Sequence, residues 1–392
     1  MNSSIFDEVV PRRGSNSYKY DSRADVPSDT IPLWVADMDF RACPPILDAL
    51  RRRVDRGVFG YTFVPAEYYA AIDAWFTSRH GWSIPSQHVI YTSGVVPAIS
   101  AIIKALAKEG DKVLVNTPVY NCFFSSIRNN GCVALESPLR LENNCYTIDF
   151  DALEAAASDP RCSLMLLCNP HNPAGRVWTA DELRRIADIC ARNGVTVVSD
   201  EIHCELVYHP HRYTPFATVA GHCPHVSCVS PSKAFNIAGL QIANIVAPDA
   251  AMREKIDRAI NINEVCDVNP FGVDALIAAY RRGGEWLDAL IPYLHDNYTL
   301  LRDFFATHFP HLPVLPLEGT YLAWVDCRSL GIDSATLEEK LIADARVWLN
   351  AGSMYGSAGE GFLRVNLACP RSVLAEALRR LAASTVLKPA IN

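Results

Sequence analysis

Short apolar runs alternate with segments of helical periodicity through the first two thirds of the chain. The apolar runs predict strands at 89–91, 112–115, 132–135, 163–168, 195–199, 226–229 and 241–246. Helical periodicity between them predicts helices at 95–108, from 120 onward and at 180–192. Continuous apolar strands separated by helices are typical of a mostly parallel sheet covered on both faces. The pattern therefore predicts an α/β fold for this part.

The last third has a different pattern. It is helical from residue 271, and a long helical segment at 285–307 is expected to bridge two domains. Runs at 315–326 and 347–351 then alternate with helices at 334–345 and 371–382, which predicts a smaller α+β domain. We expect an N-terminal arm and part of the small domain over 1–46, a large domain over 47–284 and the small domain over 285–392.

Composition and charge narrow the class of function. The chain has 392 residues, 49% of them hydrophobic, and can bury a large core. Its net charge of -7 comes without a long basic run, so we expect small-molecule partners, no nucleic acid and no membrane. The first residues lack the apolar core of a secretory signal, and Lys104 interrupts the longest apolar run. We expect a cytoplasmic protein.

The cysteines favour reduced thiols. There are 13, an odd number, scattered through apolar segments without a C-x-x-C pair. The group His222, Cys223, His225 and Cys228 has ligand types that suit zinc, but Cys228 falls in a predicted strand and Pro224 indicates a loop. We expect no metal site.

The stretch from Ser230 to Leu240 carries the candidate chemistry. Lys233 lies between hydroxyl residues and an apolar run, directly after a predicted strand. A buried lysine loses hydration, which lowers its pKa and makes the neutral, nucleophilic amine available. On this stretch alone, a surface lysine at a strand-to-helix turn is equally compatible with the pattern.

Polar residues follow several of the predicted strands. In parallel sheets, ligands bind at the carboxyl ends of the strands, so these residues are expected to converge on one cleft. They are Ser93 and Gly94, Tyr120, Asn169 to Asn172, Asp200 with His203, and Ser230 to Lys233. Taken singly, Asn172 can simply form a turn, Asp200 can cap the following segment, and His203 can be a satisfied core histidine.

Two further positions suit an anion. Gly94 precedes a predicted helix, whose first N–H groups and positive dipole end can bind phosphate. Arg364 lies in an apolar strand, where its guanidinium needs either a bound anion or a structural ion pair.

Together these motifs resemble the class I/II aminotransferase superfamily, of pyridoxal 5'-phosphate (PLP) fold type I. Within it, the chain looks similar to the cystathionine β-lyase-like C-S lyase branch. The resemblance covers nearly the whole chain. It rests on the segments 32–40, 169–175, 199–203, 230–240, 318–321 and the strand around Arg364.

The resemblance implies a fold and a set of roles. The fold would be a large domain with a mostly parallel sheet of the seven-stranded type, sandwiched by helices, plus a smaller α+β domain. Lys233 would bind PLP covalently and act as the base, Asp200 would pair with the pyridine nitrogen, and Asn172 would bind the ring oxygen. Other implied cofactor contacts are Tyr120 on the ring face, His203 near the ring, and Val95, Val96, Ser230 and Ser232 around the phosphate.

Substrate binding and assembly also follow from the resemblance. Arg364 and Tyr61 would bind the substrate, Arg364 through its carboxylate, and Tyr61 would reach the site near the phosphate from the other subunit of a homodimer. Either Lys233 or Tyr61 would protonate the departing sulfur. The chain has His203 and Gln241 where better-known aminotransferases tend to have Tyr and Arg. These departures favour β-elimination from a cysteine S-conjugate such as cystathionine. The alternatives are an aminotransferase of neutral or aromatic amino acids and a PLP-binding regulatory protein that acts through protein contacts.

Overall fold

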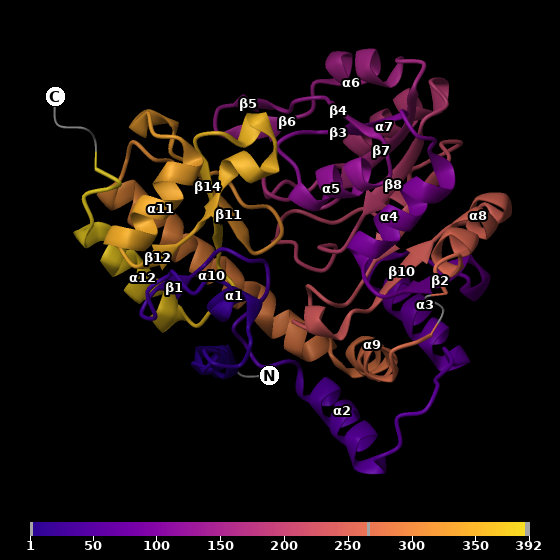
Figure 1. The fold of residues 1–392 in the computed structure, drawn as a ribbon, viewed down its shortest axis with the longest axis horizontal. Helices are drawn as coiled ribbons and strands as arrows, with labels where there is room; N and C mark the ends of the chain where they lie inside the picture. The colour runs from indigo at the N-terminus through magenta and orange to yellow at the C-terminus, as the bar shows by residue number, and fades with distance from the viewer. Residues whose placement is uncertain (1–2, 265–266, 389–392) are drawn as a thin grey trace.

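A computed structural model describes residues 3–264 and 267–388. A seven-stranded sheet with strand order β2-β10-β9-β8-β7-β3-β4 forms its larger part (Figure 1). The strands are β2 (Val89–Thr92), β3 (Lys112–Val115), β4 (Val133–Glu136), β7 (Cys162–Cys168), β8 (Thr196–Asp200), β9 (His225–Val229) and β10 (Ala243–Val246). The predicted α/β fold with a mostly parallel sheet is confirmed.

One strand runs against the others. β10 pairs antiparallel with both β2 and β9, whereas the remaining neighbours in this sheet pair in parallel. Two parallel neighbours are usually joined by a crossover helix, whereas residues 230–242, which join β9 to β10, contain only the 3₁₀ turn Ala238–Leu240. The connection returns beside its own strand, and both of its ends lie at one edge of the sheet.

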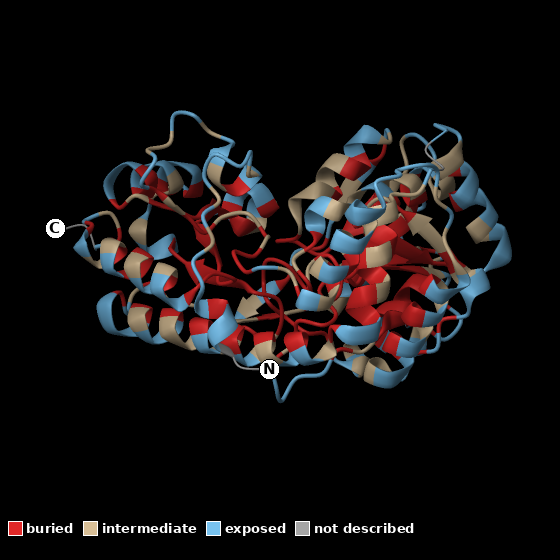
Figure 2. Cartoon of the chain, turned by 90° about the horizontal axis from the view of Figure 1, so that it is seen from below, coloured by how far each residue is buried: buried red, intermediate tan, exposed pale blue. Residues whose placement is uncertain are grey.

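Helices cover the sheet and bury apolar faces against it (Figure 2). They are α4 (Val95–Leu106), α5 (Asn121–Asn129), α6 (Phe150–Ala157), α7 (Ala180–Arg192), α8 (Ala250–Asn261) and, beside them, α2 (Pro44–Arg56), α3 (Ala66–His80) and α9 (Pro270–Arg282). Helix α7 begins where predicted because Thr179 and Glu182 form a reciprocal capping box. Helix α3 buries one apolar face, with Ile72, Trp75 and Phe76.

The C-terminal part is built on a second sheet, of order β11-β14-β13. Its elements are α10 (Gly284–His308), β11 (Leu322–Asp326), α11 (Ser334–Asp344), β12 (Val347–Trp348), β13 (Asn350–Ala351), β14 (Phe362–Asn366) and α12 (Arg371–Ala383). β12 pairs in parallel with β1 (Ile31–Pro32), so the N-terminal segment lies against the C-terminal elements (Figure 1). The domain boundaries at 46/47 and 284/285 stay predictions.

The N-terminal arm is more ordered than its polar sequence indicates. It contains a 3₁₀ turn, Ser3–Asp7, and the short helix α1 (Tyr18–Asp21). Phe6 is buried in a cluster of aromatic rings with Phe40, Trp286 and Tyr293. The arm is therefore packed on the body of its own chain.

Some local predictions were wrong or incomplete. Helices α6 and α8 and the hairpin β5 (Arg140–Glu142) to β6 (Cys145–Thr147) were not predicted. The expected strand at 315–326 is regular only from Leu322, because Thr320 has a φ of 70° and turns the chain.

Each cysteine within the described ranges is unpaired. Within those same ranges, every helix is too short or too polar to cross a bilayer.

Candidate active site

A cavity of about 250 Å³ lies where the strands of the large sheet end. This volume is close to the range of roughly 300–1,000 Å³ that is usual for small-molecule sites. The predicted residues that line the cavity are Val95, Val96, Tyr120, Asn172, Asp200, His203, Ser232 and Lys233. Five separate loops thus bring their polar residues to one place, as expected for the carboxyl edge of a parallel sheet.

Lys233 lies on the connection between β9 and β10. Its Nζ donates a hydrogen bond to the carbonyl oxygen of Ala36 at 2.6 Å. Burial lowers the pKa of Lys233 to about 8, and the charge of Arg364 acts in the same direction. Asp37 and Asp200 oppose this shift. The amine is therefore much closer to its neutral form at physiological pH than an ordinary lysine.

Ser230 anchors the start of this connection rather than lining the cavity. Its Oγ lies 2.5 Å from the carbonyl oxygen of Ile242 and 2.9 Å from Ser232 Oγ. The backbone N–H of Ser232 also donates to Ser230 Oγ, at 3.1 Å. Ser230 thus orients Ser232, whose side chain is the one at the cavity.

Asp200 ends β8 and is only 3% exposed. The backbone N–H of Ile202 donates to its Oδ1 at 3.1 Å. Burial raises the pKa of Asp200 to about 7, although the charge of Lys233 lowers it. A cation brought against this carboxylate inside the cavity would restore its ionised form.

Arg364 lies in β14; it contacts Asn172, a lining residue of the cavity, but is not itself one of the lining residues. It donates from Nη1 to Asn172 Oδ1 at 3.1 Å and from Nη2 to the carbonyl oxygen of Trp34 at 2.8 Å. Its guanidinium also lies over the ring of Tyr355, 4.9 Å from the centroid. Its Nε is buried and has no hydrogen-bond partner among the described residues. The alternative expected from the sequence was a structural ion pair, but none of the described carboxylates pairs with Arg364. Its guanidinium can therefore bind an anion.

Two other lining residues are held uncharged by burial. The pKa of His203 is well below its usual value because of desolvation and the charges of Lys233 and Arg364. The pKa of Tyr120 is well above its usual value, again mainly through desolvation. Both side chains are therefore neutral at physiological pH.

The start of α4 forms another wall. Gly94 precedes the helix with a φ of 154°, in the region that favours glycine. Val95 and Val96, which line the cavity, are the first two residues of the helix, and their N–H groups have no acceptor in a preceding turn. This wall is suited to a phosphate.

Tyr61 is away from this cavity in its own chain. It is 95% exposed, in a loop where Val58, Phe59 and Phe63 are also exposed. Its assignment to a partner subunit's site stays a prediction.

Sequence reasoning missed the role of Ala36, whose carbonyl oxygen accepts from Lys233 Nζ and from the Tyr321 hydroxyl at 3.0 Å. A backbone acceptor cannot be recognised from the type of its side chain. Only the position of Ala36 within the segment 32–40 associated it with the site. Cys168 and Gln241 also line the cavity and were not predicted to bind there.

Comparisons with known proteins place the chain in a family. The family model described as aminotransferase class I and II matches residues 14–381. The cystathionine β-lyase PatB of Bacillus subtilis is 40% identical, over 97% of this chain and 99% of that protein. The structure of cystalysin from Treponema denticola, which contains pyridoxal 5'-phosphate, has a TM-score of 0.93 and 36% identity, over 96% of this chain and 98% of that one.

A PLP-bound C-S lyase from Staphylococcus hominis is also similar, with a TM-score of 0.91 and 33% identity over 96% of this chain and 97% of that one. The family match spans most of the chain, and PatB exceeds 30% identity over nearly its whole length. The chain belongs to the aminotransferase class I and II family.

Proposed function

We propose that this protein is a PLP-dependent C-S β-lyase that cleaves cystathionine or related cysteine S-conjugates to a thiol, pyruvate and ammonia. The observation that carries the proposal is that Lys233, with a lowered pKa, and the buried Asp200 line one cavity of cofactor size. The similarity to PatB and to the two PLP-bound structures supports the choice of cofactor and reaction.

The residues at the cavity fit PLP. A phosphate suits the first N–H groups of α4 and the hydroxyl of Ser232. A protonated pyridine nitrogen would supply the cation that Asp200 lacks, and Lys233 offers an amine to the aldehyde. Asn172 would bind the ring oxygen, and Tyr120 and His203 would contact the ring; all three line the cavity.

Bound PLP supplies an electron sink for the charge that develops at the substrate Cα. Lys233, once free of the cofactor, is placed to remove the Cα proton as general base, a role that suits a pKa near 8. Asp200, as an anion, holds a proton at the pyridine nitrogen. Arg364, which binds the cavity residue Asn172, would bind the substrate carboxylate and keep the Cα near Lys233.

The proposal includes a homodimer in which Tyr61 completes the partner's site. The loop around Tyr61 exposes Val58 to 76%, Phe59 to 59% and Phe63 to 79%, which is unusual for apolar residues close together on a monomer. A second subunit would cover them. The unpaired thiols of the described cysteines suit the cytoplasm, where we place the enzyme.

The test is an absorbance spectrum of the purified protein beside its Lys233→Ala variant, followed by addition of L-cystathionine with a thiol reagent. We expect a visible band from lysine-linked cofactor in the wild type only, and thiol and pyruvate release without a 2-oxo acid. Turnover that requires a 2-oxo acid would instead identify an aminotransferase. Full cofactor occupancy with no turnover of any amino acid would favour a regulatory protein, and failure to take up PLP would refute the proposal.

A further inference from the structure

Residues 34–38, here the bridging segment, run between Arg364 and Lys233. The carbonyl oxygen of Trp34 accepts from Arg364, and that of Ala36 accepts from Lys233. Between and beyond them, Asn366 Nδ2 donates to the carbonyl oxygens of residues 35 and 37, both at 2.6 Å. The bridging segment therefore touches both the candidate base and the candidate carboxylate-binding residue through its backbone.

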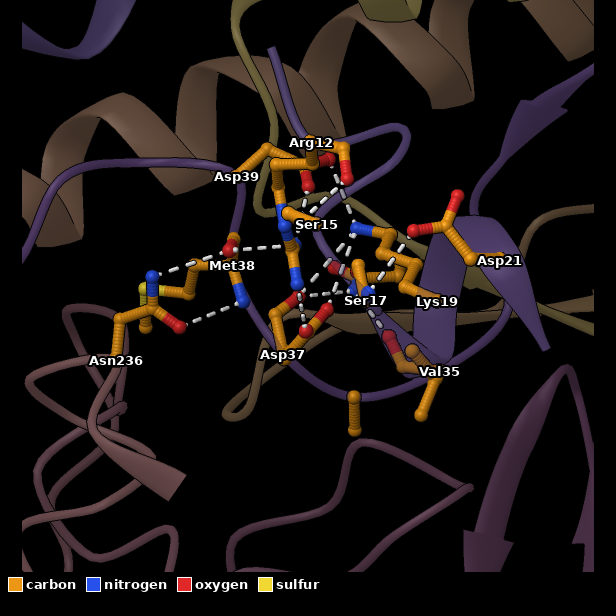
Figure 3. A network of polar contacts seen from close by, with 12 residues as sticks. Arg12, Ser15, Ser17, Lys19, Asp21, Val35, Asp37, Met38, Asp39 and Asn236 are labelled. Carbon is orange, nitrogen blue, oxygen red and sulfur yellow. Dashed lines mark hydrogen bonds and ion pairs between the residues drawn. The ribbon is translucent and has the colours of Figure 1, made fainter. Parts of the chain in front are cut away.

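The N-terminal arm holds this segment through a group of ion pairs (Figure 3). Arg12 reaches Asp37 with Nη2 at 2.5 Å and Asp39 with Nη1 at 2.6 Å. Lys19 is fully buried and donates from Nζ to Asp39 Oδ2 at 2.8 Å. Two cations thus face two carboxylates, and the group is close to neutral.

Asn236 ties the same segment to the lysine connection. Its Oδ1 accepts from the backbone N–H of Met38 at 3.0 Å, and its Nδ2 donates to the carbonyl oxygens of Met38 and Phe40 at 3.0 and 2.7 Å. Asn236 has a φ of 54° and lies three residues after Lys233. Figure 3 shows Asn236 on one side of Met38 and the ion pairs on the other.

We propose that Arg12, Lys19 and Asn236 are positioning residues, which hold the bridging segment so that Lys233 meets the Ala36 carbonyl rather than a carboxylate. This inference rests on the proposed role of Lys233. The physical reason is competition, because Asp37 is close enough to attract the Lys233 charge. A carboxylate already bound by Arg12 attracts Lys233 less than a free one, so the amine can lose its proton.

The competing explanation is that the arm only anchors the N-terminus. A matched control exists for it, because Arg41 forms a bidentate pair with Glu8 of the same arm, with distances of 2.8 to 3.0 Å. Arg41 and Glu8 are exposed and contribute no described hydrogen bond to residues 34–38. Removing this pair deletes an ion pair of the arm but leaves the partners of Asp37 and Asp39 in place.

The experiment measures the titration of Lys233 in the PLP-free protein. Lysine amines are labelled with acetic anhydride across pH, and the peptide that contains Lys233 is quantified by mass spectrometry. In Arg12→Gln we expect the labelling midpoint to rise by about 0.5–1 pH unit, since Asp37 then keeps only Lys19, at 3.6 Å, and stabilises the ammonium form of Lys233 more strongly. In Arg41→Ala we expect the wild-type midpoint.

A double variant guards against misfolding and separates charge from anchoring. Arg12→Gln with Asp37→Asn removes both members of the pair, so we expect the midpoint to return to the wild-type value or below it. A midpoint that stays unchanged or falls in folded Arg12→Gln, or one that rises equally in Arg41→Ala or the double variant, would overturn the inference. Because no cofactor is present, this result is independent of whether the wild type binds PLP.

Discussion

Two lysines, Lys19 in the arm and Lys233 at the cavity, lie near the same bridging segment in different surroundings. Lys19 has a carboxylate partner, Asp39, at 2.8 Å and no exposed surface. Among the described residues, no carboxylate lies within ion-pair distance of Lys233, whose Nζ meets only a carbonyl. Burial with a counter-charge makes a lysine structural, whereas burial beside a cavity without one makes it reactive.

The adjacent acids Asp200 and Glu201 show the same contrast. Glu201 accepts from the Phe216 N–H at 2.8 Å and from Ser199 Oγ at 3.0 Å, and it is buried in the protein core. Asp200 points to the cavity. The end of β8 therefore separates a functional acid, its last residue, from a structural acid directly after it.

The sharpest test of this contrast is Lys233→Ala. We expect β-lyase turnover to fall by roughly 10²–10⁴-fold or more, because the general base is removed. Steady-state release of thiol from L-cystathionine measures it, with folding checked by circular dichroism. Activity within tenfold of the wild type would show that Lys233 is not the base.

Asp200→Asn should remove a pH-dependent loss of folding stability. The pKa of Asp200 is about 7 in the folded protein and roughly 3.9 when unfolded, so the folded state binds more protons between these values. Stability of the PLP-free wild type is therefore lost as pH rises from ~4 to ~7, by about 4 kcal/mol from this group.

The variant should lack this loss, which urea unfolding at pH 5 and pH 8 without PLP measures. Glu201→Gln is the comparison, because burial raises the pKa of Glu201 too, but this variant also loses the charge that accepts from Phe216 and Ser199 in the core. Parallel pH profiles of wild type and Asp200→Asn would contradict the assignment.

Lys19→Met should mainly destabilise the fold. Removing one member of a buried pair costs about 3 kcal/mol, at the lower end of the usual range because Asp39 keeps Arg12. The urea midpoint reports this change. A loss no larger than that of an exposed pair would mean that Lys19 is not held by its charge.

Arg41→Ala should have the smallest effect. Its pair with Glu8 is exposed on both sides, so water screens it and we expect the urea midpoint to stay within error of the wild type. A loss comparable to that of Lys19→Met would show that the exposed Arg41 pair and the buried Lys19 pair stabilise the fold equally.

The sequence was most informative where local pattern and function coincide. The strands before Asp200 and Lys233 were predicted within about two residues, and the polar residues after them do meet. The hairpin of β5 and β6 was not predicted, although its sequence contains a turn signal, Asn143 and Asn144. Both residues have positive φ, as in the tight turns that Asn favours.

Other features could not be predicted from sequence patterns. Arg12 and Asp37 are 25 residues apart, and no periodicity relates them. The reversal of β10 follows a connection without a crossover helix, and apolar patterning does not specify strand direction.

The connection between β9 and β10, residues 230–242, also restricts which mutations the protein tolerates. Its two ends are joined by Ser230 and Ile242, so its contour length is set by the strands on either side. One inserted residue adds up to ~3.5 Å of chain between two ends that a single hydrogen bond of 2.5 Å holds together. A substitution between 234 and 242 leaves this length unchanged, whereas an insertion or deletion there changes it directly after the residue that carries the amine.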